Sequence, residues 1–191
     1  MFPVEMIREA VANALIHQDF LLSGVSVMVE IFTDRIEISN PGPPTVQVDR
    51  FIDEYRSRNE RMADLMRRLG ICEEKGSGID KMVHAAEVSQ LPAPAFIVDS
   101  VRTTCILFGQ RAFSRMTRDD RVRACYQHCC LRYVLREATT NQSLRARFGL
   151  PDAKAESVSR IIKDAIASGL IRQEAATKGS RKFARYVPYW S

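Results

Sequence analysis

The stretch Glu156-Ser157-Val158-Ser159-Arg160-Ile161-Ile162-Lys163-Asp164-Ala165 decides the fold of the C-terminal third of this 191-residue chain. Its apolar residues recur at i, i+3, i+4 and i+7, which is the spacing of one buried helix face. The opposite face carries the polar and charged residues Glu156, Ser157, Arg160 and Lys163. A nucleic-acid recognition helix needs this arrangement, with one face held by a core and the other offering donors to bases and phosphates.

The segments around this stretch predict a winged helix-turn-helix. Helices are expected over 119–136, 141–148 and 154–168, and two strand-like segments follow at 169–172 and 182–187. Asn141 is placed to cap the second helix, from which Arg145 and Arg147 are expected to project. The turn and second strand, which form the predicted wing, add four more basic residues: Lys178, Arg181, Lys182 and Arg185.

Charge is divided unevenly along the chain. The net charge is +5, yet residues 1–112 carry 12 basic against 16 acidic residues and residues 113–191 carry 16 basic against 7 acidic residues. These counts give −4 and +9 for the two parts. Such segregation predicts that the C-terminal part meets a polyanion, and double-stranded DNA is the expected partner. A solvated basic surface, or a winged helix used only for dimerisation, is the alternative.

The first 112 residues alternate helices and strands. A helix is expected over 4–18, a β-hairpin over 25–39, a rigid loop over 40–44 and a charged helix over 49–69. A helix over 79–88 and strands at 95–98 and 103–108 follow. The segment 109–117 is the expected joint, so the chain is predicted to hold two domains, 1–112 and 113–191.

Two patterns in this part are typical of a nucleotide site. Glu9, Asn13 and His17 lie four residues apart on one helical face, where Asn can offer a neutral oxygen to Mg²⁺ and Glu can orient a water. The run Gly76-Ser77-Gly78 opens a helix, whose free N–H groups and positive dipole end suit phosphate. Each pattern alone is also compatible with an ordinary polar helix face or a common glycine turn.

Taken together, these residues resemble a known family. The segments that carry the resemblance are Glu9-Ala-Val-Ala-Asn13-Ala-Leu-Ile-His17-Gln-Asp19-Phe, Asp34-Arg-Ile-Glu-Ile-Ser-Asn40-Pro-Gly42 and Glu74-Lys-Gly76-Ser-Gly78-Ile79. They look like the divergent GHKL-type, Bergerat-fold ATPase domain found in the C-terminal part of RecG-like ATP-dependent helicases and in ATP-binding transcriptional regulators. The tail, including Asn141-Gln-Ser-Leu-Arg-Ala-Arg-Phe and Arg185-Tyr-Val-Pro-Tyr-Trp190, is similar to the winged-helix end of that family.

The resemblance implies an α/β (α+β) two-layer Bergerat sandwich followed by a small winged-helix domain. Glu9 would be the general base and Asn13 the Mg²⁺ ligand. Asn40 and Gly42 would lie under the adenine of ATP, and residues 45–75 would form the lid. The remaining nucleotide-binding positions would be His17, Gly76, Ser77, Gly78 and Ile79.

Two departures from the family favour ATP binding over hydrolysis. Hydrolytic members commonly have an Asp where Asn40 stands, and the glycine box is reduced to a single GxG. Family members usually carry a further domain before this point, whereas this chain begins directly at the Glu9–Asn13 helix. An N-terminally truncated sandwich that lacks an edge element is therefore one option, and a natural short form is another.

Nothing in the sequence indicates a signal peptide or a membrane span, and the cytoplasm is the expected compartment. The five cysteines are expected to be reduced. Cys125, His128 and Cys129 share one helical face, but buried cysteines are favoured over a zinc site because a fourth ligand is missing.

The sequence therefore predicts a nucleotide-sensing, DNA-binding transcriptional regulator, in which a homodimer is one option. One alternative is a DNA-binding regulator whose degenerate ATPase fold serves only dimerisation. The other alternative is a DNA-dependent ATPase. The absence of a P-loop motif argues against a helicase motor.

Overall fold

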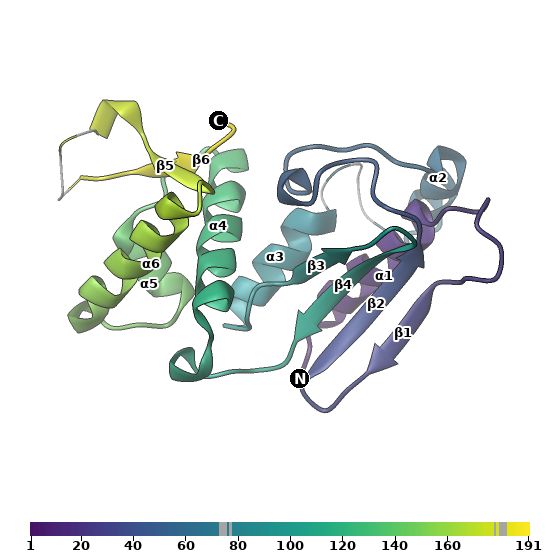
Figure 1. The fold of residues 1–191 in the computed structure, drawn as a ribbon, viewed down its shortest axis with the longest axis horizontal. Coiled ribbons are helices and arrows are strands. Elements are labelled where there is room, and N and C mark those ends of the chain that lie inside the picture. Colours follow the sequence, from purple (N-terminus) through teal and green to yellow (C-terminus); the bar gives the residue numbers. More distant parts are fainter. Residues whose placement is uncertain (73–75, 77, 178, 180–182) are drawn as a thin grey trace.

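The N-terminal half is an antiparallel sheet with helices packed on one face (Figure 1). The computed structural model describes residues 1–72, 76, 78–177, 179 and 183–191. Within these residues the half comprises α1 (Val4–His17), β1 (Met28–Ile31), β2 (Arg35–Pro41), a 3-10 turn η1 (Val48–Arg50), α2 (Glu60–Arg68), α3 (Gly78–Val88), β3 (Ala95–Val98) and β4 (Arg102–Phe108).

Strand order in the sheet is β1-β2-β4-β3, and every neighbouring pair is antiparallel. Alternation places Ile36 and Ile38 of β2 and Leu107 of β4 on the face that meets the helices. Met6 of α1 and Met82 of α3 complete this core and are fully buried. The α+β class and the hairpin predicted from the sequence are confirmed.

Residues 49–69 do not form the single helix that their composition predicted. Only α2 is helical, after η1 and an irregular segment. The interruption has a tertiary cause. The side-chain amide of Asn59 donates to the carbonyls of Ile16 and Gln18 at the end of α1, and Arg58 pairs with Asp19 at 2.6 Å. These bonds hold the segment against α1 and outweigh its local helix propensity.

The C-terminal half begins after a 3-10 turn η2 (Phe113–Arg115) and contains three helices, α4 (Arg118–Val134), α5 (Asn141–Arg147) and α6 (Ala155–Ala167) among the described residues. The short turns η3 (Asp152–Lys154) and η4 (Ala175–Thr177) accompany a two-stranded antiparallel sheet, β5 (Ile171–Gln173) and β6 (Tyr186–Pro188). The order of these elements is the predicted one. The apolar stripe of α6 is confirmed, because Val158, Ile161, Ile162 and Ala165 are all buried.

Helix α5 is capped by a residue other than the predicted one. The hydroxyl of Thr140 accepts the N–H of Ser143, and the hydroxyl of Ser143 accepts the N–H of Thr140, which forms a capping box. Asn141 is the first residue inside the helix. Its amide donates instead to the carbonyl of Ala155 and the hydroxyl of Ser159, so it ties α5 to α6.

The two halves share a continuous core. Val83 of α3 and Ala93 belong to the same apolar cluster as Cys125 and Cys129 of α4. Both cysteines are fully buried, as predicted. The division at residue 112 stays a prediction, and the packing of α3 against α4 joins its two sides.

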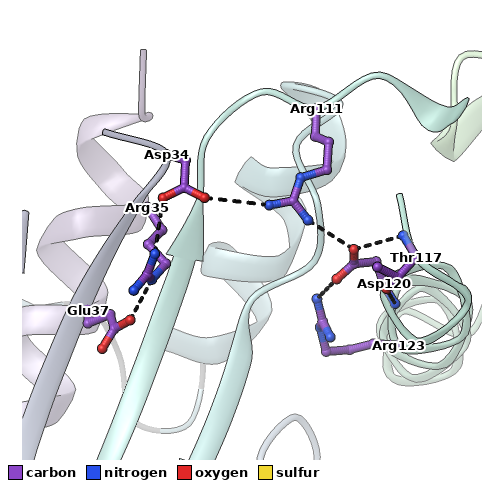
Figure 2. A network of polar contacts seen from close by, with 7 residues as sticks. All are labelled: Asp34, Arg35, Glu37, Arg111, Thr117, Asp120 and Arg123. Carbon is purple, nitrogen blue, oxygen red and sulfur yellow. Dashed lines mark hydrogen bonds and ion pairs between the residues drawn. The ribbon is translucent and has the colours of Figure 1, made fainter. Parts of the chain in front are cut away.

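A polar network pins the segment between the halves (Figure 2). Arg111 donates to the carboxylate of Asp120 at 3.0 Å and lies 3.9 Å from that of Asp34 in the β1–β2 turn. Asp120 also accepts hydrogen bonds from Arg123 at 2.7 Å and from the backbone of Thr117 at 3.0 Å. Burial works to raise the pKa of Asp120, but the hydrogen bonds from Arg123 and Thr117 lower it overall.

Asp120→Asn should destabilise the fold at pH 7 by an amount on the order of 1 kcal/mol, because the amide keeps the cap but loses both charged partners. In the folded state the pKa of Asp120 lies below its ordinary value of 3.8. The stabilisation is therefore present above that pH and is lost as pH falls through the folded-state pKa. Urea unfolding at pH 7 and pH 3 measures it. An equal deficit at both pH values would contradict the role of the charge.

Candidate nucleotide site and basic face

A cavity of about 120 Å³ lies between α1, α3, the sheet and residues 44–56. It brings together residues that are far apart in the sequence. Seven of the predicted nucleotide-binding and catalytic residues line it: Glu9, Asn13, His17, Asn40, Gly76, Gly78 and Ile79. Ser77 lies outside the described residues.

The first turn of α3 rests against the polar face of α1. A Cβ atom added to Gly78 would lie 3.0 Å from Oε2 of Glu9 and 3.3 Å from Nδ2 of Asn13. The close approach of the helices therefore depends on glycine at this position. It places the free N–H groups at the start of α3 beside the Glu9–Asn13 face.

Glu9 is buried and already has a cationic partner. Its carboxylate accepts hydrogen bonds from Nε and Nη2 of Arg8, at 3.2 and 3.0 Å. These two hydrogen bonds fix the orientation of the Glu9 carboxylate.

Asn13 offers an unsatisfied polar atom to the cavity. Its Nδ2 is buried and has no hydrogen-bond partner among the residues that the structure describes. An unpaired buried donor is costly, so the site is suited to a ligand oxygen. Because the amide can turn about its last bond, it can offer either the nitrogen to a phosphate or the oxygen to a metal.

His17 lies at the end of the same helix face, and it is partly buried. Burial lowers the pKa of its imidazole, and the nearby positive charge of Arg58 lowers it further. The neutral ring is therefore the dominant form at pH 7.

Asn40 and Gly42 occupy different surroundings. Asn40 is paired with Thr103 in the sheet, is buried, and lines the cavity, and its Nδ2 donates to the carbonyl of Pro41. Gly42 does not line the cavity, contrary to the prediction. It has a φ of +90°, and an added Cβ would lie 2.6 Å from Nη1 of Arg58, so this glycine makes room for the Asp19–Arg58 pair.

Part of the cavity lining is apolar, and no sequence pattern pointed to it. Phe51 and Phe96 meet edge to face with ring centroids 5.0 Å apart. Ile38, Met82 and Cys105 are also part of the apolar lining. Burial raises the pKa of the Cys105 thiol to about 12, so it contributes packing rather than a nucleophile. These residues belong to no motif, and the pairing of Phe96 with Cys105 appears only in the register of the sheet.

Some of the predicted nucleic-acid-binding residues are exposed, and others are buried. On α6, Arg160, Lys163 and Glu156 are exposed, Ser157 is half-buried, and Arg160 pairs with Glu156 at 2.5 Å. Arg185 is exposed just before β6. Lys178, Arg181 and Lys182 lie outside the described residues.

The two arginines of α5 do not project freely, contrary to the prediction. Arg147 is 5% exposed and donates to the carbonyl of Leu91 at 2.7 Å, because α5 packs it toward the end of α3. Arg145 is largely buried, with hydrogen bonds to Asn141 and Asp152. The candidate nucleic-acid surface therefore rests on α6 and Arg185 among the described residues.

Most of the N-terminal half is similar in sequence to an ATPase-like family. Residues 24–107 match the family described as "Putative ATP-dependent DNA helicase recG C-terminal". The match includes the sheet, α2 and α3. No curated protein matches the chain significantly.

One solved structure shows a similar fold. It is the DIP2311 protein from Corynebacterium diphtheriae, with 21% sequence identity and a TM-score of 0.55. The similarity covers 86% of this chain but 35% of that protein, so the chain spans about a third of its relative's length. No described helix combines the length and apolar character needed to cross a membrane.

Arg58→Ala should raise the pKa of His17 while leaving it below 6.5, because burial is the larger cause and remains. The imidazole C–H resonances followed by NMR against pH would show this shift. Arg61→Ala, which removes an exposed arginine three residues away, is the matched control. If both variants leave the His17 titration unchanged, Arg58 does not act on the ring.

Proposed function

We propose that the chain binds ATP with Mg²⁺ and uses the nucleotide to control a DNA-binding C-terminal half. The observation that carries the nucleotide proposal is the cavity that joins Glu9, Asn13, Asn40 and Gly78. The match of residues 24–107 to an ATPase-like family supports the same ligand class.

The phosphates would lie at the start of α3. Gly78 is its first residue, and the helix N-terminus supplies N–H donors and a positive dipole end. Asn13 is the residue that would hold Mg²⁺ through its amide oxygen, since hard cations prefer oxygen ligands. When bound, the ion would neutralise phosphate charge.

The base would lie against the apolar part of the cavity lining. Ile38, Met82 and Phe51 supply an apolar wall, and Asn40 stands beside them as the buried polar group that can give specificity. The carbonyl oxygen of Asn40 can accept a hydrogen bond from the amino group of adenine. Guanine presents a carbonyl at that ring position, so ATP should bind better than GTP.

Binding is favoured over hydrolysis. The candidate base Glu9 is hydrogen-bonded twice by Arg8, and the adenine-facing residue is an uncharged Asn. A DNA-dependent ATPase would require Glu9 to leave this pair. A scaffold without a ligand would leave the buried amide of Asn13 without compensation.

The cavity must enlarge to take ATP. Its volume of about 120 Å³ is below the roughly 300–1,000 Å³ of pockets that hold drug-sized ligands. Residues 45–56 are the part of the wall that can move, because they belong to the predicted lid and contain only the short turn η1.

The same wall contacts the C-terminal half. The hydroxyl of Tyr126 donates to the backbone carbonyl of Asp49, and that of Tyr189 donates to the Asp49 carboxylate. Arg50 lies over the ring of Trp190, with its guanidinium carbon 4.7 Å from the ring centroid. Movement of the lid on nucleotide binding would therefore reach the C-terminal half directly.

DNA binding by residues 113–191 is supported by three features. These are the net charge of +9, the order of three helices and a two-stranded sheet, and the exposed cations on α6. The order and the buried stripe of α6 fit a winged helix with α6 as the recognition helix.

Asn13→Ala should weaken ATP binding several-fold when Mg²⁺ is present and little in chelator, because a metal ligand contributes nothing to a metal-free complex. Asn40→Ala should weaken binding equally in both conditions, since its partner is the base. Calorimetry on the full chain measures both effects. Identical losses for Asn13→Ala with and without Mg²⁺ would assign it a structural role, and no heat from the folded wild type would remove the nucleotide proposal.

Arg160→Ala should lower the affinity of the full chain for duplex DNA about tenfold. It should also reduce the ratio of the affinities for strong and weak DNA sites. The matched control is Arg61→Ala, which removes one exposed charge from the acidic half and should change nothing. Fluorescence anisotropy from 50 to 200 mM salt gives affinity and salt dependence together. A salt-independent affinity, or equal losses from both variants, would contradict the assignment of α6.

A further inference from the structure

Helix α2 brings a cation to the cavity that the sequence patterns did not single out. Ala63 and Met66 of α2 pack against Ala12 and Ile16 of α1, so the two helices lie together. Arg67 comes one turn after Ala63, and both residues line the cavity. Its position is therefore beside the segment of α1 that carries Asn13 and His17.

Arg67 and its neighbour Arg68 share an acidic partner but differ in their exposure and in their position relative to the cavity. Both pair with Asp64, Arg67 at 3.3 Å and Arg68 at 2.9 Å. The Arg67 side chain is 28% exposed and faces the cavity wall, whereas that of Arg68 is 77% exposed and does not line the cavity. Only one of the two is in a position to touch a ligand.

The acidic residues that line the cavity are already paired with arginines. Glu9 is neutralised by Arg8, and Glu54 is paired with Arg50 at 3.1 Å. Arg56 also lines the cavity. With both glutamates of the lining paired to arginines outside it, Arg56 and Arg67 are the lining cations that a polyanionic ligand could contact. A guanidinium can hold phosphate oxygens in a bidentate manner.

We propose that Arg67 is the residue that makes this site select nucleoside di- and triphosphates over monophosphates, by binding the phosphates beyond the first. The inference rests on the proposed nucleotide site and adds a phosphate-specific contact to it. The weak pairing with Asp64 does not oppose this role, because partly exposed ion pairs exchange readily for a more highly charged partner.

The test is calorimetry of the full chain with AMP, ADP and ATP, all with Mg²⁺. Arg67→Ala should weaken ATP and ADP binding about tenfold and change AMP binding less than twofold. Arg67→Lys should recover part of the loss, and Arg68→Ala should match the wild type. Asp64→Asn, which removes a competing anion, should leave ATP binding unchanged or tighter.

The other possible results would contradict either the role of Arg67 or the proposed nucleotide binding. Equal losses for AMP and ATP in Arg67→Ala would show that the residue acts through the fold, and equal losses from Arg67→Ala and Arg68→Ala would show a general charge effect. ATP binding that survives Arg67→Ala would overturn this inference alone. A folded wild type that binds none of the three nucleotides would overturn the proposed nucleotide function together with it.

Discussion

The close packing of α3 on α1 is the constraint on which the candidate site depends. Because Gly78 has no side chain, the start of α3 can lie directly against Glu9 and Asn13. A Cβ atom at this position would lie 3.0 Å from Oε2 of Glu9 and 3.3 Å from Nδ2 of Asn13. Alanine is a better helix former than glycine, yet its methyl group at this position would press on two polar side chains. The local preference and the tertiary requirement conflict here. Such conflicts are expected where a residue is kept for a site rather than for stability.

Helix α3 connects that site to the other half of the molecule. At its far end Glu87 binds Nδ1 of His128 at 3.0 Å and lies 3.4 Å from Nε of Arg147. Burial lowers the pKa of Arg147, and the charge of Glu87 opposes that effect. Nε and Nη1 of Arg147 have no hydrogen-bond partner among the described residues. A buried ionic group that is only partly satisfied adds little stability, so its consequence is to fix how α4 and α5 sit on α3.

Periodic patterns predicted the elements that local sequence controls. The hairpin, the stripe of α6 and the glycine that opens α3 follow from alternation, helical spacing and backbone freedom. Long-range contacts decide the rest. Arg147 was expected at the surface because basic residues usually lie there, but its partners Glu87 and Leu91 are far away in the chain. Phe51 and Arg67 line the cavity because the chain returns to α1 after η1, where Asn59 binds the carbonyls at the end of α1 and α2 packs on that helix. No motif marks that return.

The contacts of Asp49 and Arg50 with the C-terminal half determine how nucleotide binding would affect that half. Tyr126, Tyr189 and Trp190 hold this turn in the arrangement that leaves a small cavity. If ATP requires a larger cavity, part of its binding free energy must displace these contacts. Coupling between two sites is reciprocal. A partner that repositions the C-terminal residues would therefore change ATP affinity by the same factor by which ATP changes the affinity for that partner. Because Trp190 also donates to the hydroxyl of Tyr126 at 3.1 Å, these contacts form one connected set. The coupling would therefore run through Tyr126 of α4 together with Tyr189 and Trp190 near the C-terminus.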